Sequence, residues 1–350
     1  MSITLERRIN LRNDLIQRIG AAAAAGLINV IAIANNHNVT TQTVYRSLKK
    51  LEEDGLIIRR RVGKKSTFKL RDHIESFRLE LCDLREGTVW TNNISPLVKG
   101  LPEEAFRCCN YIFTEMLNNA IDHSDGTHVD ITVLNNEYRV LISIADNGVG
   151  IFSKISSAMG LEEKRFAVLE LAKGKFTTDP TSHTGEGIFF SSKAADSFGI
   201  FSDELLFSPL DREDLGVDSA VSDYVRKNEV GTEVLFTVKY QRTRTMRDLF
   251  DKYTNEPDHY GFTKTVVPVL LLEYGDSEAL FTSRSQAKRL LVRFEKFEHI
   301  ILDFADIEEI GQGFADEIFR VFAIAHPNTK ITPTHCSEQV RKMIEHVKAL

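Results

Sequence analysis

The chain has 350 residues, of which 42% are hydrophobic and 27% are charged, and its formal net charge is −6. This length predicts two or three domains with packed cores. The sequence contains no apolar run of 18 residues and no apolar signal segment, and its four cysteines give neither a metal-binding spacing nor a disulfide framework. These features favour a cytoplasmic protein that has no membrane partner.

Positive charge is concentrated in the N-terminal part of the chain. Residues 1–71 hold 14 Lys and Arg against 5 Asp and Glu, so they carry a net +9 and the remaining 279 residues carry −15. A small basic unit on an acidic body predicts contact with a polyanion. Apolar spacing predicts three helices and then a basic hairpin, at residues 11–25, 27–36, 41–54 and 56–70. Thr40 supplies an N-cap for the third helix, and Gly55 ends it.

Three helices followed by a basic hairpin resemble a winged helix-turn-helix, and the stretch VTTQTVYRSLKKLEEDGLI is similar to bacterial winged-helix transcription factors. The resemblance implies that residues 1–71 bind double-stranded DNA, with the third helix in the major groove and the hairpin over phosphates. The residues expected to contact DNA are Thr41, Gln42, Thr43, Tyr45, Arg46, Lys49, Arg60, Arg61, Lys64 and Lys65. A unit that contacts only proteins is the alternative.

Three short stretches in the middle of the chain predict a nucleotide site. FTEMLNNAIDHS (113–124) offers Glu115, Asn119 and Asp122 at i, i+4 and i+7, which places a carboxylate and an amide on one helix face. ADNGVGI (145–151) follows an alternating apolar strand and supplies an acid and then glycines. HTGEGIFFSSK (183–193) is a glycine-bearing turn that enters a helix, where free N–H groups and the helix dipole favour phosphate.

The order and spacing of these stretches resemble the GHKL ATPase superfamily over residues 96–241. The resemblance implies an antiparallel sheet backed by helices, with ATP and Mg²⁺ as cofactors. Asn119 would coordinate Mg²⁺, Asp146 would accept the adenine amino hydrogen, and Glu115 stands where hydrolysing members carry a general base. The other nucleotide contacts that it implies are Asp122, Gly148, Gly150, Ile151, Thr184, Gly185, Glu186, Gly187, Ile188 and Thr232. Because the Glu186 carboxylate would repel the γ-phosphate, binding of ATP is better supported than turnover.

Strands and helices alternate in residues 261–350, which predicts a small α/β domain. The stretch IILDFADIEEIGQGFADEIFRVF resembles a STAS domain. The resemblance places the phosphoacceptor serine of that family at residues 310–313, which contain no hydroxyl. The expected role of this unit is therefore docking of a protein partner or coupling within the chain.

We thus expect a multidomain α+β protein with a winged helix, a GHKL α/β sandwich and a small α/β STAS-like domain. The predicted linkers are a helix at residues 72–95 and a polar bridge at residues 242–260. Homodimer formation stays open.

Two functions compete at this point. One is a transcriptional regulator in which ATP closes a lid at residues 152–183 and repositions the winged helix. The other is an anti-sigma-type serine/threonine kinase, or a GHKL ATPase that acts on a protein partner. Histidine autophosphorylation has little support, because His73 lacks the proline-bearing box of a dimerisation helix. The missing phosphoacceptor serine favours the regulator.

Overall fold

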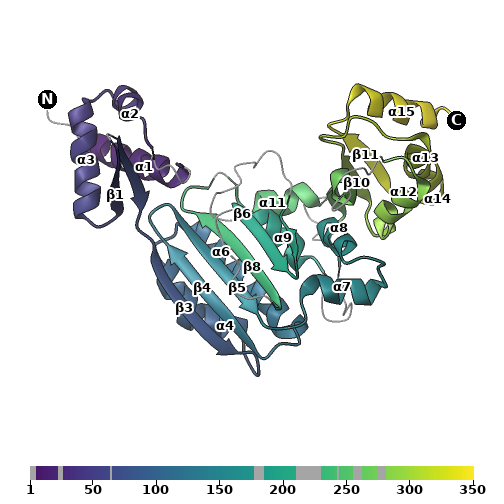
Figure 1. The fold of residues 1–350 in the computed structure, drawn as a ribbon, viewed down its shortest axis with the longest axis horizontal. Coiled ribbons are helices and arrows are strands. Elements are labelled where there is room, and N and C mark those ends of the chain that lie inside the picture. The colour runs from purple at the N-terminus through teal and green to yellow at the C-terminus, as the bar shows by residue number, and fades with distance from the viewer. Residues whose placement is uncertain are drawn as a thin grey trace.

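The computed structural model describes residues 5–22, 27–63, 65–176, 185–209, 230–242, 244–254, 262–273 and 281–350. An N-terminal unit, a middle unit with a six-stranded sheet and a C-terminal unit follow one another along an open V (Figure 1). The sheets of the first two units are antiparallel and that of the third is parallel. The predicted multidomain α+β class is therefore confirmed.

The N-terminal unit consists of three helices and a hairpin, as predicted. Its elements are α1 (Leu5–Ala21), α2 (Val30–Asn36), α3 (Thr41–Glu53), β1 (Ile57–Val62) and β2 (Lys65–Leu70). The Thr40 hydroxyl accepts the Thr43 N–H at 3.3 Å, which caps the start of α3. Val44, Leu48 and Leu51 form the buried stripe of this helix and pack into the core of the unit.

The predicted linker helix at residues 72–95 is wrong. Strand β3 (His73–Glu80) begins three residues after β2 ends and pairs antiparallel with β4 along its whole length. Phe77, Leu79 and Leu81 alternate with polar residues at period two, which is the strand pattern that the helix prediction overlooked. The helical part of the segment is confined to short turns: α4 (Glu86–Val89), the π-helix η1 (Trp90–Ile94) and α5 (Ser95–Val98).

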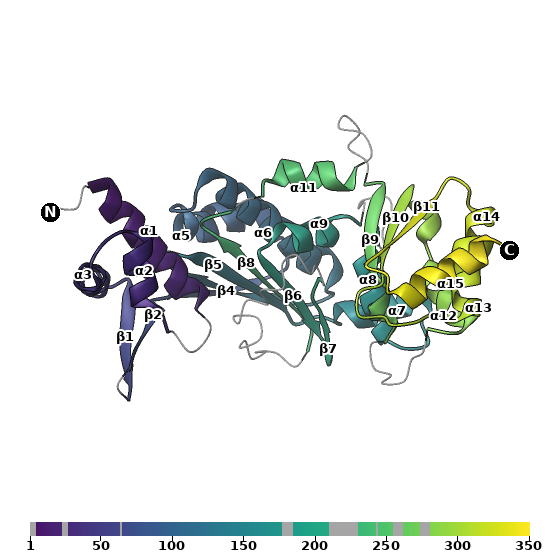
Figure 2. The ribbon, with the colours of Figure 1, turned by 90° about the horizontal axis from the view of Figure 1, so that it is seen from above.

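The middle unit is an antiparallel sheet with strand order β3-β4-β5-β8-β6-β7. Helices α5, α6 and α9 lie together on one side of it (Figure 2). The remaining elements of this unit are α6 (Glu103–His123), β4 (His128–Asn135), β5 (Arg139–Asp146), α7 (Ile151–Met159), α8 (Arg165–Lys173), α9 (Gly187–Ala194), β6 (Ser197–Ser202), β7 (Leu205–Phe207) and β8 (Thr232–Lys239). Helices α7 and α8 fall in the predicted lid, of which residues 177–183 lie outside the described residues.

The predicted polar linker at residues 242–260 contains a helix, α11 (Met246–Tyr253), that packs on the middle unit. Thr245 and Asp248 form a capping box at its start. Its Tyr253 is buried, and its ring lies 5.0 Å from that of Phe189 on α9. This segment therefore belongs to the folded body, because its apolar residues are spaced on one helix face.

The C-terminal unit is a three-stranded parallel sheet of order β11-β10-β9 with helices around it, which confirms the predicted small α/β domain. Its elements are β9 (Lys264–Pro268), the 3-10 helix η3 (Val269–Glu273), α12 (Arg284–Leu291), the 3-10 helix η4 (Phe294–Lys296), β10 (His299–Asp303), α13 (Gln312–Asp316), the π-helix η5 (Glu317–Phe322), α14 (Ala323–Ala325), β11 (Lys330–Thr334) and α15 (Glu338–Lys348). One hydrophobic core runs through the middle and C-terminal units, whereas the N-terminal unit has its own. Within the described ranges, the helices are too short or too polar to span a membrane.

Candidate functional site

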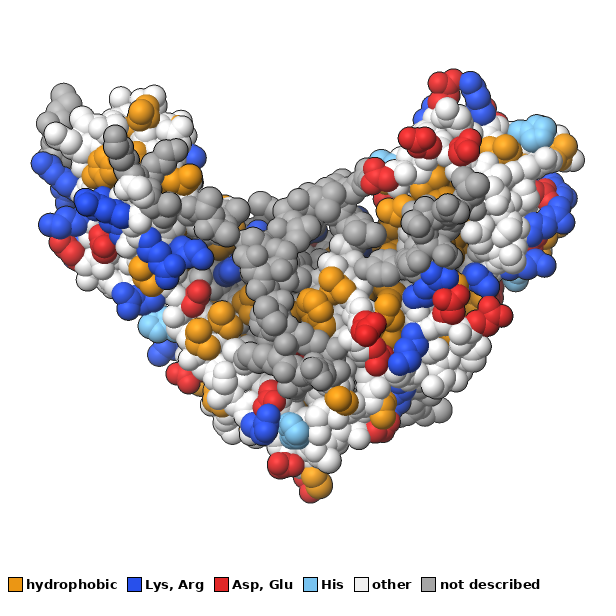
Figure 3. All heavy atoms as spheres, viewed as in Figure 1, with side chains coloured by type: hydrophobic (Ala, Val, Ile, Leu, Met, Phe, Trp, Pro, Cys, Tyr) orange, Lys and Arg blue, Asp and Glu red, His pale blue; other side chains and the backbone are white. Residues whose placement is uncertain are grey.

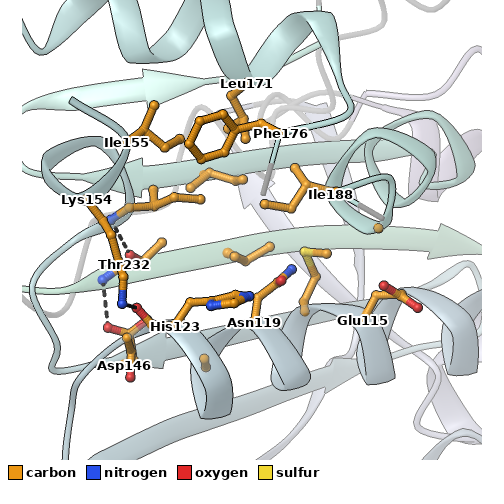
Figure 4. Close-up of a pocket in the computed structure, with 18 of the residues that line it drawn as sticks. Glu115, Asn119, His123, Asp146, Lys154, Ile155, Leu171, Phe176, Ile188 and Thr232 are labelled. Atoms are coloured by element: carbon orange, nitrogen blue, oxygen red, sulfur yellow. Dashed lines mark hydrogen bonds between the residues drawn. The ribbon is translucent and has the colours of Figure 1, made fainter. Parts of the chain in front are cut away.

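A pocket opens between α6, the loop after β5, α7 and the segments around α8 and α9 (Figure 4). The space between these elements is about 1110 Å³ when the open mouth is included. Residues from all three predicted stretches and from β8 meet in its lining: Glu115, Asn119, Asp146, Gly150, Ile151, Gly185, Gly187, Ile188 and Thr232. The structure thus brings together segments that lie more than a hundred residues apart.

Asp146 is the polar residue at one end of the pocket. It is the last residue of β5 and is only 5% exposed. Its Oδ1 accepts the N–H of Gly148 at 2.9 Å and the N–H of Thr232 at 3.1 Å. The Thr232 hydroxyl in turn accepts the N–H of Ile151 at 2.9 Å. These bonds fix the carboxylate before any ligand enters, so a ligand N–H group meets a preorganised acceptor.

Two glycines near Asp146 allow close backbone packing. A Cβ on Gly231, which has φ +87°, would lie 2.1 Å from the Asp146 carbonyl oxygen. A Cβ on Gly148 would lie 2.0 Å from the Ser124 carbonyl oxygen. Gly148 was predicted to contact the nucleotide, but the structure places it against Ser124 and outside the pocket lining.

The other end of the pocket combines a helix N-terminus with an acid. Glu115 and Asn119 lie one turn apart on α6, and Gly187 begins the eight-residue helix α9. The Glu115 carboxylate lies against this start, since a Cβ on Gly187 would be 2.1 Å from its Oε2. Glu186 does not line the pocket, and partial burial raises the pKa of its carboxyl. The helix N-terminus favours an anionic group here.

Asn119 faces the pocket between these two ends (Figure 4). Its Nδ2 is buried, and no described group bonds to it. Rotation of the amide exchanges its nitrogen and oxygen, so either atom can face a ligand. Mg²⁺ takes one or two oxygen ligands from the protein and others from phosphates. The residues present therefore fit a magnesium ion that arrives with a phosphate ligand.

Apolar side chains close the pocket above these polar groups. Ile155 on α7, Leu171 on α8, Phe176 after α8 and Ile188 on α9 point into it (Figure 4). A flat, largely apolar ring can lie between these walls while its polar edge reaches Asp146.

Some predicted residues lie elsewhere, and others were missed. Asp122 is exposed on α6 and outside the lining, whereas its neighbours His123 and Ser124 line the pocket. Thr184 lies outside the described residues. Lys154 on α7, which no motif indicated, also lines the pocket and donates to the His123 carbonyl at 2.7 Å. It carries no sequence signal, because a lone lysine on a helix is ordinary.

The residues predicted to contact DNA lie on the N-terminal unit. Of the α3 set, Thr41, Gln42, Tyr45, Arg46 and Lys49 are exposed. Thr43 is half-buried, and its N–H and hydroxyl both bond to Thr40. On the hairpin Arg60 and Arg61 are exposed, whereas Lys64 and the side chain of Lys65 lie outside the described parts. Figure 3 shows Lys and Arg side chains gathered on this unit.

Two parts of the chain match family models. Residues 109–242 match the histidine kinase-, DNA gyrase B- and HSP90-like ATPases. Residues 286–341 match a STAS-like domain of unknown function. The chain contains a GHKL ATPase domain and a STAS-like domain. Neither of these two models extends over residues 1–108.

Sensor proteins are among the relatives of the chain. Over 75 residues it is 36% identical to sensor protein VraS of Staphylococcus saprophyticus and 35% identical to sensor protein VraS of Staphylococcus epidermidis. These matches cover 21% of this chain, and the chain spans about a fifth, 20%, of the length of each relative.

Proposed function

We propose that this protein is an ATP-binding, DNA-binding transcriptional regulator. In this proposal the N-terminal unit is a winged helix, and the nucleotide state of the GHKL domain changes its affinity for DNA. The observation that carries ATP binding is the Asp146 carboxylate, fixed by two backbone N–H groups at one end of an apolar pocket. The start of α9 at the other end suits phosphates.

ATP fills the pocket in one orientation under this proposal. Asp146 accepts the adenine amino hydrogen, and the base lies between the apolar walls. The phosphates reach the start of α9, where Asn119 would hold the Mg²⁺ ion that neutralises part of their charge. Glu115 stands beside them, where it orients and deprotonates a water molecule if the protein hydrolyses ATP.

The DNA-binding part of the proposal rests on the exposed polar face of α3 and the exposed arginines of the hairpin. The buried stripe of α3 leaves Gln42, Tyr45 and Arg46 on its outer face. Such a helix can enter the major groove with these side chains toward base edges. Arg60 and Arg61 then contact phosphates without regard to sequence.

A direct connection between the two units supports their coupling. Two residues, Arg71 and Asp72, separate β2 of the hairpin from β3 of the ATPase sheet. Tyr138, immediately before β5, is buried in the core of the N-terminal unit. Asp146 ends the same strand, about 26 Å away at 3.3 Å per residue. The DNA-binding unit and the nucleotide pocket thus meet opposite ends of β5.

A protein kinase or an ATPase that acts on a protein partner is the second candidate. The similarity to the sensor protein VraS favours it, although the match covers only 75 residues. Transfer of labelled phosphate from ATP to this chain or to another protein would support the kinase over the regulator.

The test of ATP binding is calorimetry with ATP and Mg²⁺. Asp146→Asn should weaken binding by about 1.5–3 kcal/mol, because a charge-assisted hydrogen bond to adenine is lost. Asp122→Asn is the matched control, since Asp122 is exposed and outside the pocket lining, and it should bind like the parent. If the parent binds no ATP, or Asp146→Asn binds as tightly as the parent, the assignment is wrong.

A further inference from the structure

Residues 170–176 lie between the nucleotide pocket and the STAS-like domain. Leu171, Gly174 and Phe176 line the pocket. Glu170 and Lys173, in the same stretch, are buried and bond to residues of α12 and the turn that follows it. Some residues of segment 170–176 therefore form a wall of the pocket, and others contact the STAS-like domain.

Lys173 makes the first contact with the STAS-like domain. It is fully buried, at 0% exposed, and forms an ion pair with Glu170. Its ammonium also donates to the carbonyl oxygens of Arg289, at 3.3 Å, and Val292, at 3.1 Å. These carbonyls belong to the C-terminal end of α12, where a cation offsets the negative end of the helix dipole.

Arg293 of the STAS-like domain makes the second contact. Its guanidinium donates to the Glu170 carboxylate at 3.2 Å and to the Gly174 carbonyl at 2.8 Å. It also lies 5.2 Å from the centre of the Phe176 ring. Gly174 and Phe176 both line the pocket, so one side chain of the STAS-like domain touches two residues of its wall.

The wall has little room to rearrange around these contacts. Gly174 has φ +80°, and a Cβ there would lie 2.8 Å from the Phe262 ring and 3.0 Å from the Phe189 ring. Glu170 and Lys173 are buried charges, and the side chain of Arg293 is only 10% exposed. These charges must stay paired, because each would be costly to bury alone. Separation of the STAS-like domain would therefore take Arg293 away from Glu170 and also remove its contacts with Gly174 and Phe176.

We propose that Arg293 is a positioning residue of the nucleotide pocket, through which the docked STAS-like domain sets the affinity for ATP. The proposal rests on the proposed ATP binding and assigns the STAS-like domain a regulatory role in it. A partner that draws this domain away from α8 lowers ATP affinity, since Gly174 and Phe176 lose their support.

The test compares ATP–Mg²⁺ affinity in the full chain. Arg293→Gln should weaken binding by about 5–150-fold, the usual range of coupling between sites. Arg293→Lys keeps the charge but not the planar fork, so it should recover part of the loss. Lys288→Gln is the control, because Lys288 is an exposed basic residue of the same helix, α12. It should bind ATP like the parent.

Hydrogen exchange supplies a readout that ATP affinity alone does not. ATP should slow amide exchange in α12 of the parent and not in Arg293→Gln, because coupling is reciprocal. If Arg293→Gln loses its native circular dichroism spectrum, Arg293→Lys carries the test and must still bind ATP more weakly than the parent. If the parent and the folded Arg293 variants bind ATP equally well, the inference about Arg293 is overturned, but the proposed binding of ATP stands. A parent that binds no ATP overturns the proposed function itself.

Discussion

At the scale of single residues, Glu115 is the acidic residue of the pocket that lies nearest to where the phosphates of ATP are expected. Its carboxylate lies against the start of α9, where the phosphates of ATP are expected. A carboxylate beside phosphates repels them, and it is useful only if it acts on the attacking water. The residue therefore distinguishes a protein that hydrolyses ATP from one that only senses it.

Glu115→Gln should lower ATP hydrolysis by about 10²–10⁴-fold, because the general base is lost. ATP itself should stay bound, since the amide no longer repels the phosphates. Phosphate release and calorimetry on the same preparation measure the two effects separately. An unchanged rate of phosphate release would remove Glu115 from the mechanism.

Lys173 makes a second residue-scale prediction, which concerns pH. Burial lowers the pKa of the Lys173 ammonium to about 8. The nearby charge of Arg293 also lowers it, whereas the carboxylates of Glu170 and, more weakly, Glu295 raise it. Between pH 8 and pH 10.5 the unfolded chain then binds more protons at this site than the folded chain. The free energy of unfolding should therefore rise with pH through this window.

Denaturant unfolding of the parent and Lys173→Met at several pH values tests this sign. The rise above pH 8 should be present in the parent and missing from the variant, because Met does not titrate. Below pH 8 Lys173 is protonated in both states, so it adds no slope there. Parallel curves for the two proteins above pH 8 would show that Lys173 keeps an ordinary pKa.

At the scale of elements, the sequence predicted best where a motif is short and local. Glu115, Asn119 and Asp146 were predicted to share one site because the order and spacing of their motifs resemble the GHKL ATPases, and all three line the pocket. Leu171 and Phe176 were missed, because tertiary packing and not local spacing brings them to the pocket.

The same reason explains the errors in secondary structure. Strand β3 was predicted as a helix, although its apolar residues alternate, because an edge strand buries few of them. Helix α11 was assigned to a linker, because its many charges concealed the apolar face that packs on α9. Pro268, which has no N–H to donate, is the last residue of β9, and the 3-10 helix η3 follows it at Val269.

The contact between α1 and the β4–β5 turn yields a prediction at this scale. Gly20 is helical, and Ala normally stabilises such a position by about 0.5–1 kcal/mol. Here a Cβ would lie 2.3 Å from the Tyr138 ring. Gly20→Ala should therefore destabilise the N-terminal unit in thermal unfolding, against its helix propensity.

Gly87→Ala is the matched control for this change, since no atom of the described residues lies within 4 Å of a Cβ at Gly87. It should keep the stability of the parent or raise it. A Gly20→Ala protein as stable as the parent would mean that Tyr138 does not hold α1 closely.

At the scale of the whole molecule, both outer units are joined to the middle unit, but in different ways. The STAS-like domain shares its core and contacts the pocket wall through Arg293. The N-terminal unit keeps a separate core, which receives Tyr138 from the turn before β5. The ATPase domain is therefore placed to transmit the state of one end of the molecule to the other.

This central claim is tested most directly by four affinities measured at one salt concentration. They are the affinity for a mixed-sequence DNA duplex with and without ATP–Mg²⁺, and the affinity for ATP–Mg²⁺ with and without that duplex. Linkage requires the two ratios to be equal. Coupling through the ATPase domain predicts that both ratios differ from one by about 5–150-fold. Tight binding of both ligands with ratios of one in both directions would show two independent modules and contradict this coupling.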